Sequence, residues 1–157
     1  MAFYKKKSSK KGPVRSKKVT FDGINFASGL EKYMYIALKK AKIKFEYEPR
    51  TYQLLDTFQF ESSAIERQSN GKGEFKDRGN KKILGIKYTP DFEGDSWTVE
   101  TKGRANESFP IRYKLFKNWI QNNDPGRLLL KPQNQKECDE AIQIILKKEN
   151  NNERNRS

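Results

Sequence analysis

The sequence predicts one α+β domain in which a mixed β-sheet is flanked by helices. Apolar residues recur at helical spacing in three separate segments, and one segment alternates apolar and polar residues as a half-buried strand does. Two further strand-like runs flank a short polar turn and predict a β-hairpin. The resulting order, α-β-β-β-β-α-β-α, suits a sheet covered by helices. A length of 157 residues fits a single domain.

The first helix is expected to begin at Ser28. Ser28 and Glu31 fit a capping box, in which each side chain satisfies a backbone N–H at the start of the helix. The apolar face consists of Leu30, Tyr33, Met34, Ala37, Leu38 and Ala41. A strand over residues 43–48 follows and ends at Pro49. A second extended stretch over 51–60 has no evident partner strand within the chain.

Residues 61–82 are polar and are predicted to form a structureless insert, which is often functional at this length. Its basic residues are Lys72, Lys76, Arg78, Lys81 and Lys82. Two interpretations remain open. The basic side chains bind a phosphate backbone, or the insert is a tolerated, solvated extension.

The C-terminal half contains the hairpin, two helices and one strand. The hairpin spans 83–92 and 97–102, with Glu93 to Ser96 as the turn, so Glu93 and Asp95 are expected to be solvated. The next elements are a helix opened by Phe109-Pro110 with Ile111, Leu115, Trp119 and Ile120 on its buried face, a strand over 127–131, and a helix over 135–148. The domain is predicted to span 21–148, followed by a disordered tail over 149–157.

The net charge of +13 is unevenly distributed. Residues 1–20 contain eight Lys or Arg and no acidic residue, which predicts a disordered basic arm. A basic arm on a mildly basic domain is typical of a nucleic-acid-binding protein. The alternative is an arm that only improves solubility.

The composition also excludes several classes of site. The chain has no histidine, which excludes histidine-dependent hydrolysis and histidine-ligated zinc. Its single cysteine, Cys138, excludes an internal disulfide and is expected in the core. No apolar run is long enough for a membrane span, and the chain is expected in the cytoplasm of a host or infected cell.

The hairpin carries the most informative residues of the chain. Glu100 and Lys102 lie two residues apart in one strand and point to the same face, and the hairpin brings Asp91 close to both. Two carboxylates and an ammonium group suit a hard divalent cation with a water beside it. Asp91, Glu100 and the backbone carbonyl of Thr101 are the expected ligands of Mg²⁺, for which Mn²⁺ would substitute. Otherwise, Glu100 and Lys102 form only a solvated strand face.

The pattern Pro90-Asp91 followed by Glu100-Thr101-Lys102 resembles the PD-(D/E)XK nuclease signature. With Ser28-Gly29-Leu30-Glu31 and the segment 43–48, the chain resembles the phage endonuclease I family of Holliday-junction resolvases over about residues 26–103. The resemblance implies a restriction-endonuclease-like fold and Glu31 as a further site carboxylate, at the first metal or a second. It also implies a homodimer that exchanges the first helix and 43–48, which would place Glu31 beside the other chain's Asp91 and Glu100. The insert 61–82 departs from the family.

These observations predict a Mg²⁺-dependent endodeoxyribonuclease that acts on four-way or otherwise branched DNA. Lys102 would orient or deprotonate the attacking water or stabilise the phosphate. The expected DNA-binding residues are Arg104, Arg112, Lys114 and Lys117, together with the basic residues of the insert. Two alternatives remain: a general PD-(D/E)XK nuclease that cuts linear DNA equally fast, and a non-enzymatic basic DNA-binding protein whose binding ignores Mg²⁺.

Overall fold

A four-stranded sheet forms the centre of the computed structural model, which describes residues 18–103 and 106–154. The strand order is β12 (Leu128–Leu130), β11 (Trp97–Val99), β10 (Phe92–Glu93) and β3 (Glu46–Tyr47). β11 runs parallel to β12 and antiparallel to β10, and β10 runs antiparallel to β3. The sheet is therefore mixed, as the sequence predicts. The predicted strand 43–48 is reduced to the two residues of β3.

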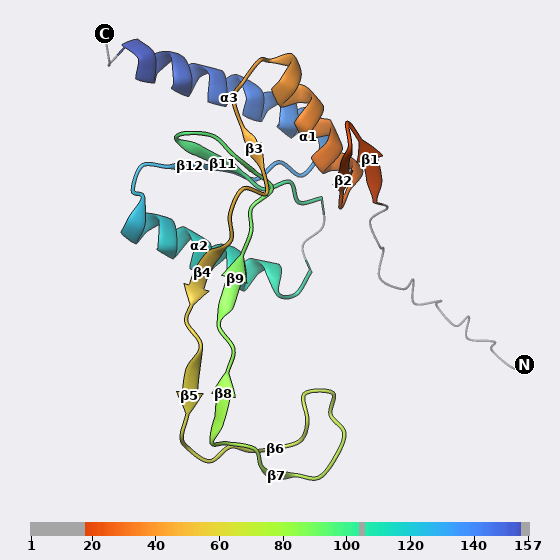
Figure 1. Cartoon of the computed structure of the whole chain (residues 1–157), viewed down its shortest axis with the longest axis vertical. Helices are drawn as coiled ribbons and strands as arrows, with labels where there is room; N and C mark the ends of the chain where they lie inside the picture. Colours follow the sequence, from red (N-terminus) through yellow and green to blue (C-terminus); the bar gives the residue numbers. More distant parts are fainter. Residues whose placement is uncertain (1–17, 104–105, 155–157) are drawn as a thin grey trace, which may run out of the picture.

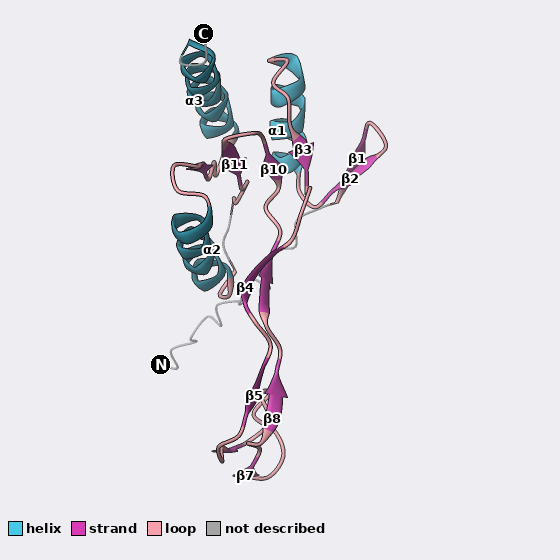
Figure 2. Ribbon diagram, turned by 60° about the vertical axis from the view of Figure 1, so that its left-hand side comes forward, coloured by secondary structure: helices cyan, strands magenta, loops and turns pink. Residues whose placement is uncertain are grey.

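Helices cover both faces of this sheet (Figures 1 and 2). α1 (Gly29–Lys40) and α3 (Gln135–Arg154) pack together on one face, and α2 (Phe109–Asn123) lies on the other. The leucines of β12 follow this division. Leu128 and Leu130 contact the core beneath α1 and α3, whereas Leu129 contacts the cluster beneath α2. Alternate residues of a strand point to opposite faces, so an uninterrupted apolar run fits a strand that is covered on both sides.

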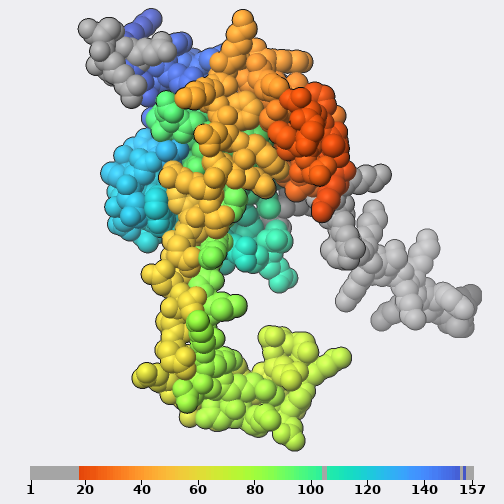
Figure 3. All heavy atoms as spheres, viewed as in Figure 1, coloured from red at the N-terminus to blue at the C-terminus, as the bar shows by residue number. Residues whose placement is uncertain are grey.

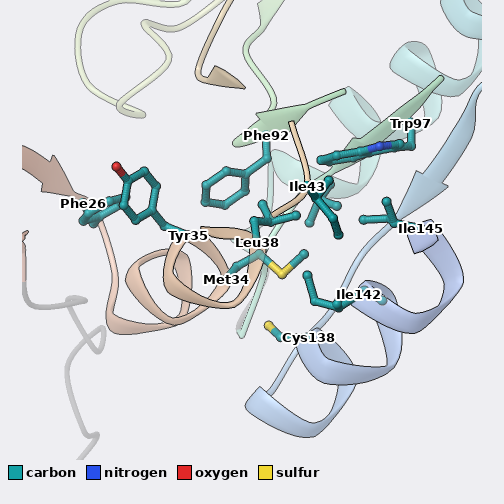
Figure 4. Packing of buried hydrophobic residues seen from close by; sticks show 12 residues of the cluster. Phe26, Met34, Tyr35, Leu38, Ile43, Phe92, Trp97, Cys138, Ile142 and Ile145 are labelled. Atoms are coloured by element: carbon teal, nitrogen blue, oxygen red, sulfur yellow. The ribbon is translucent and has the colours of Figure 1, made fainter. Parts of the chain in front are cut away.

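The main core lies between α1, α3 and the sheet (Figure 4). Met34 and Leu38 of α1 and Ile145 of α3 are fully buried together with Trp97 of β11. Each such side chain contributes about 1.5–3 kcal/mol through removal of its apolar surface from water. Cys138 is a free, buried thiol in the same core, which confirms its predicted position.

The start of α1 is confirmed at its predicted residue. Ser28 is the N-cap, and its Oγ accepts a hydrogen bond from the backbone N–H of Glu31 at 3.2 Å. Lys39 and Lys40 lie in the last turn, where positive charge complements the helix dipole.

A short N-terminal hairpin precedes α1 and was not predicted. It pairs β1 (Val19–Phe21) with β2 (Ile24–Phe26) through Asp22-Gly23, whose φ angles are 53° and 74°. Both turn residues are left-handed, which is the type I′ geometry that Asp-Gly favours between strands. The Asp22-Gly23 dipeptide is the sequence signal from which this hairpin could have been predicted. The predicted basic arm lies mostly in residues 1–17, outside the described residues, and residues 19–20 belong to β1.

A long two-stranded ribbon projects from the domain (Figures 1 and 3). β4 (Tyr52–Leu55) pairs with β9 (Ile86–Tyr88), β5 (Phe58–Phe60) with β8 (Lys81–Ile83), and β6 (Ile65–Glu66) with β7 (Lys76–Asp77). Two expectations are therefore wrong. The 51–60 stretch has partner strands in its own chain, and 61–82 is the end of a hairpin rather than a structureless loop. Non-local pairing of this kind leaves little signal in residue order.

The C-terminal helix extends beyond its predicted end. α3 runs to Arg154, so residues 149–154 of the predicted tail are helical, while 155–157 lie outside the described residues. The extension is held by the sheet: the indole N–H of Trp97 donates to Glu149 at 3.0 Å, and Asn152 donates to Ser96 at 3.3 Å. On α2, the predicted buried face is wrong at Ile111, which is 58% exposed. Among the described residues, no helix is long and apolar enough to cross a membrane.

Glu93 is buried, which contradicts its predicted place in a solvated turn. It lies in β10, and its carboxylate accepts hydrogen bonds from Arg50 at 3.0 Å, from Thr98 at 3.1 Å and from the Tyr52 hydroxyl. The buried guanidinium of Arg127 lies 3.9 Å away. Glu93 therefore joins the base of the ribbon to the central sheet and to the segment before β12.

Glu93→Ala is expected to lower the free energy of unfolding by about 3 kcal/mol, because it leaves Arg50 and the hydroxyls of Tyr52 and Thr98 without their acceptor and removes a buried charge beside Arg127. Urea unfolding measures the change. Asp95→Ala is the matched control, since Asp95 is exposed two residues further along, in the turn that follows β10. Equal losses in the two variants would show that the Glu93 network contributes nothing specific.

Candidate active site

Asp91 and Glu100 are brought together by the β10–β11 hairpin. Phe92 pairs with Val99, so Asp91 and Glu100 extend from the same end of the two strands. Asp91 Oδ2 accepts hydrogen bonds from the backbone N–H of Thr101 at 2.7 Å and from its hydroxyl at 2.6 Å. The hairpin register thus fixes the Asp91 carboxylate beside the Glu100-Thr101-Lys102 segment, as predicted.

Glu100 is buried and is held from two sides. Its backbone N–H donates to Leu130 at 2.9 Å, which continues the pairing of β11 with β12. Its Oε2 accepts a hydrogen bond from the hydroxyl of Tyr88 at 2.7 Å. Tyr88 belongs to β9, so the base of the ribbon contacts the acidic site directly. Tyr88 was not predicted as a site residue, and its position depends on long-range strand pairing.

Glu31 completes a cluster of three carboxylates while also capping α1. Its Oε1 accepts a hydrogen bond from the Ser28 hydroxyl at 2.9 Å, and its Oε2 accepts from the Ala27 N–H at 3.0 Å and the Tyr47 hydroxyl at 2.9 Å. The capping interpretation of Glu31 is therefore confirmed. The charge of Glu31 also acts on Asp91 and Glu100 of the same chain, and its role at a metal stays a prediction.

Burial and neighbouring charges destabilise the ionised forms of Asp91 and Glu100. Burial raises the pKa of Asp91 well above its ordinary value, and the charges of Glu100 and Glu31 raise it further, against the hydrogen bonds from Thr101. Burial likewise raises the pKa of Glu100, where the Tyr88 hydroxyl and Lys102 oppose the shift. A bound cation would relieve this repulsion.

Lys102 forms an ion pair with Glu100. Its ammonium lies 3.9 Å from Oε1 of Glu100, and the side chain is 29% exposed. The same ammonium lies 4.9 Å from the ring centroid of Phe109 on α2. Lys102 therefore stands at the open side of the site, between the carboxylates and the start of α2.

The donor set fits a hard divalent cation. Hydrogen bonds among the described residues use Oδ2 of Asp91 and Oε2 of Glu100, which leaves Oδ1 and Oε1 for an ion. All of these atoms are oxygens, the ligands that Mg²⁺ prefers. As arranged in the described chain, no three acidic, histidine or cysteine side chains converge closely enough to hold a metal. Oδ1 of Asp91, Oε1 of Glu100 and the Thr101 carbonyl are the ligands that fit. Both carboxylate oxygens of Glu31 already accept hydrogen bonds at the start of α1.

The predicted DNA-binding residues fall into two separate groups. Arg112, Lys114 and Lys117 are exposed on α2, whose first residue, Phe109, contacts Lys102. Lys72, Lys76, Arg78, Lys81 and Lys82 lie at the far end of the ribbon, away from the site (Figure 1). Arg78 donates to the carbonyls of Glu66 and Glu74, so it holds the ribbon end together. Arg104 lies outside the described residues.

The fold and the cluster together define a mixed α+β protein with an acidic site at the end of a β-hairpin. The chain belongs to a family of proteins of unknown function, DUF1064, whose model matches residues 11–125. The matched segment includes the ribbon and all three carboxylates, and it ends before β12 and α3. No curated protein and no solved structure matches the chain.

Asp91→Asn is expected to stabilise the metal-free protein at neutral pH. A carboxyl whose pKa is raised on folding binds its proton more tightly in the folded chain, so stability falls as the pH rises from the ordinary value of 3.8 through the raised one. The variant cannot ionise at this position and escapes that loss. Urea unfolding in EDTA across this pH range measures the difference between the two proteins.

Asp22→Asn supplies a control of opposite sign. The hydrogen bond from Lys39, with a second from Tyr35, lowers the pKa of Asp22, so this carboxylate stabilises the fold above its ordinary pKa. If Asp91→Asn is less stable than wild type at neutral pH, the hydrogen bonds from Thr101 outweigh the effect of burial on the Asp91 carboxylate, which contradicts the prediction.

Proposed function

We propose that the protein is a metal-dependent endodeoxyribonuclease that hydrolyses phosphodiester bonds. The observation that carries the proposal is the placement of Asp91 beside the Glu100-Thr101 segment at the end of the β10–β11 hairpin, with the Lys102 ammonium 3.9 Å from Glu100. Burial and neighbouring carboxylates raise the pKa of Asp91 and of Glu100, which is unfavourable for stability alone. Such clusters are typical of functional sites.

Asp91, Glu100 and the Thr101 carbonyl would hold Mg²⁺ or Mn²⁺. When bound, the ion supplies charge neutralisation at the phosphate and lowers the pKa of a water molecule. The Thr101 N–H and hydroxyl keep the Asp91 carboxylate oriented, and the Tyr88 hydroxyl does the same for Glu100. Lys102 is placed to orient the attacking water or to stabilise negative charge on the phosphate.

DNA is the proposed substrate. A net charge of +13 favours a polyanion, and phosphate contacts supply most of the affinity of such proteins for nucleic acid. The resemblance to phage endonuclease I favours four-way or branched DNA, in the cytoplasm of a bacterial or infected cell. A general nuclease would cut linear duplex as fast as a junction. Cleavage of labelled four-way, three-way and linear DNA with Mg²⁺ separates these substrates.

Asp91→Asn and Glu100→Gln are each expected to abolish cleavage while leaving DNA binding in EDTA largely intact. Each change removes a ligand charge with little change in volume, and the loss of such transition-state electrostatics costs roughly 3 kcal/mol or more, at least a hundredfold in rate. Single-turnover cleavage and fluorescence anisotropy give the two readouts.

Asp95→Asn is a matched control for this experiment, because it removes a carboxylate from the exposed turn of the same hairpin. Its cleavage rate should equal that of wild type. Full activity of Asp91→Asn or Glu100→Gln would reject the site. A wild-type protein that binds DNA but cuts none of the substrates would favour a non-enzymatic DNA-binding protein.

A homodimer is part of this proposal, because resolution of a junction needs two cuts and two symmetric sites are the simplest means. The ribbon offers a surface for it, since Leu55, Phe58, Phe75 and Leu84 are exposed there. A two-stranded ribbon is marginally stable alone in water, so burial of these side chains by a partner is favourable.

Sedimentation at micromolar concentration is expected to give a dimer, and Leu84→Lys should weaken it by placing a charge in the contact. Co-refolding of Glu31→Gln with Glu100→Gln tests exchange of α1. Exchange restores one intact site and therefore nicking, whereas sites closed within each chain restore none. A monomeric wild type would contradict the dimer proposal.

A further inference from the structure

An aromatic pair lies at the start of α2, next to the acidic site. The rings of Phe109 and Tyr113 are stacked, with centroids 5.4 Å apart and an interplanar angle of 19°. The ring centroid of Tyr113 lies 6.5 Å from that of Tyr88, whose hydroxyl donates a hydrogen bond to Glu100. Burial and the charge of Glu100 raise the pKa of Tyr113 to about 12, so the ring is within electrostatic reach of the site.

Three lysines from three elements surround this pair. Lys102, after β11, lies 4.9 Å from the Phe109 centroid. Lys117, on α2, lies 5.1 Å from the Tyr113 centroid. Lys131, after β12, lies 5.9 Å from Phe109 and 5.7 Å from Tyr113. The lysine–aromatic cluster is defined here as these five residues. Sequence reasoning missed Lys131, because only the parallel pairing of β12 with β11 brings it to the start of α2.

The cluster concentrates positive charge without neutralising it. Among the described residues, the carboxylate within ion-pair distance of these ammonium groups is Glu100, which pairs with Lys102 at 3.9 Å. Lys117 and Lys131 are exposed and are held by the rings rather than by acidic side chains. A cation over an aromatic ring gains about 0.5–1 kcal/mol at an exposed position, which orients the ammonium and keeps its charge available.

We propose that the lysine–aromatic cluster is a binding site for the phosphates of a DNA strand as it enters the acidic site. The inference rests on the proposed nuclease function and deepens it. Phe109 is only 6% exposed, so the rings orient the lysines instead of stacking on a base. Recognition is therefore of the backbone and independent of sequence.

The dimensions of the lysine–aromatic cluster fit a strand of DNA. Phe109, Tyr113 and Lys117 are spaced four residues apart and form one row along α2. At 1.5 Å per residue, the row extends about 12 Å from its first to its last member. That length corresponds to roughly three to four base-pair steps of about 3.4 Å along the axis of a duplex. Lys102 stands at the carboxylate end of the row, so the strand would leave the cluster at the site of cleavage.

The experiment compares the double variant Lys117→Met, Lys131→Met with wild type in full-length protein. Methionine keeps an apolar side chain on the rings and removes the charge. Binding of fluorescent duplex DNA in EDTA is measured over a series of KCl concentrations. Loss of two phosphate contacts should reduce the log–log salt slope by about 1.8. From 50 to 200 mM KCl, wild-type affinity should then fall about twelvefold more than that of the variant.

Two matched variants complete the test. Lys147→Met removes one exposed charge from α3, on the opposite face of the sheet, and should leave the slope unchanged. The double variant Lys117→Arg, Lys131→Arg keeps both charges and should retain the wild-type slope. Thermal unfolding midpoints check that every variant is folded. A Met double variant whose salt slope and affinity equal those of Lys147→Met overturns the inference.

Failure of this inference and failure of the proposed function are distinguishable. Slope loss in the Met double variant, without Mg²⁺-dependent cutting by wild type, supports the phosphate site and rejects the nuclease. Mg²⁺-dependent cutting by wild type, with an unchanged salt slope in the Met double variant, supports the nuclease and rejects the phosphate site. A wild-type protein that binds no DNA rejects both.

Discussion

The two hydrogen bonds from Thr101 to Asp91 are the contact on which the arrangement of the site depends. They join the strand that carries Glu100 to the residue that precedes β10, at the point where regular pairing of the hairpin has ended. Without them, the half-buried carboxylate of Asp91 would lose the two donors that offset its loss of hydration. The register of one short hairpin thus determines which carboxylates share the site.

The acidic cluster is maintained by the apolar core around it. Glu31 is positioned by the start of α1, and α1 is held by its packing against α3 and the sheet. The buried residues of that core supply the free energy that keeps mutually repelling carboxylates close together. The same fold places Tyr88 and Tyr47 as donors to Glu100 and Glu31, so each is oriented by a hydroxyl from a different strand.

The ribbon has a different physical character from the domain. Its base is anchored, because Tyr52 and Tyr88 pack with Phe116 beneath α2 and Tyr52 donates to Glu93. Its outer part has two strands and no covering layer, and it exposes apolar side chains such as Phe75 and Leu84. Tyr88 links β9, at the base of the ribbon, directly to Glu100 of the site.

The sequence by itself determined where the helices begin and which acidic residues the central hairpin brings together. Helical periodicity and capping residues located α1 and α2, and the Pro90-Asp91 and Glu100-Thr101-Lys102 segments identified the acidic pair, because these signals depend on neighbours within a few residues. Only the tertiary structure decided the ribbon, the burial of Glu93, and the positions of Tyr88 and Lys131. Each of these depends on pairing between residues distant in the chain, such as Tyr52 with Tyr88 and Leu130 with Val99. The physical reason is that strand pairing is set by complementary burial of whole surfaces, and residue order alone does not encode which surfaces meet.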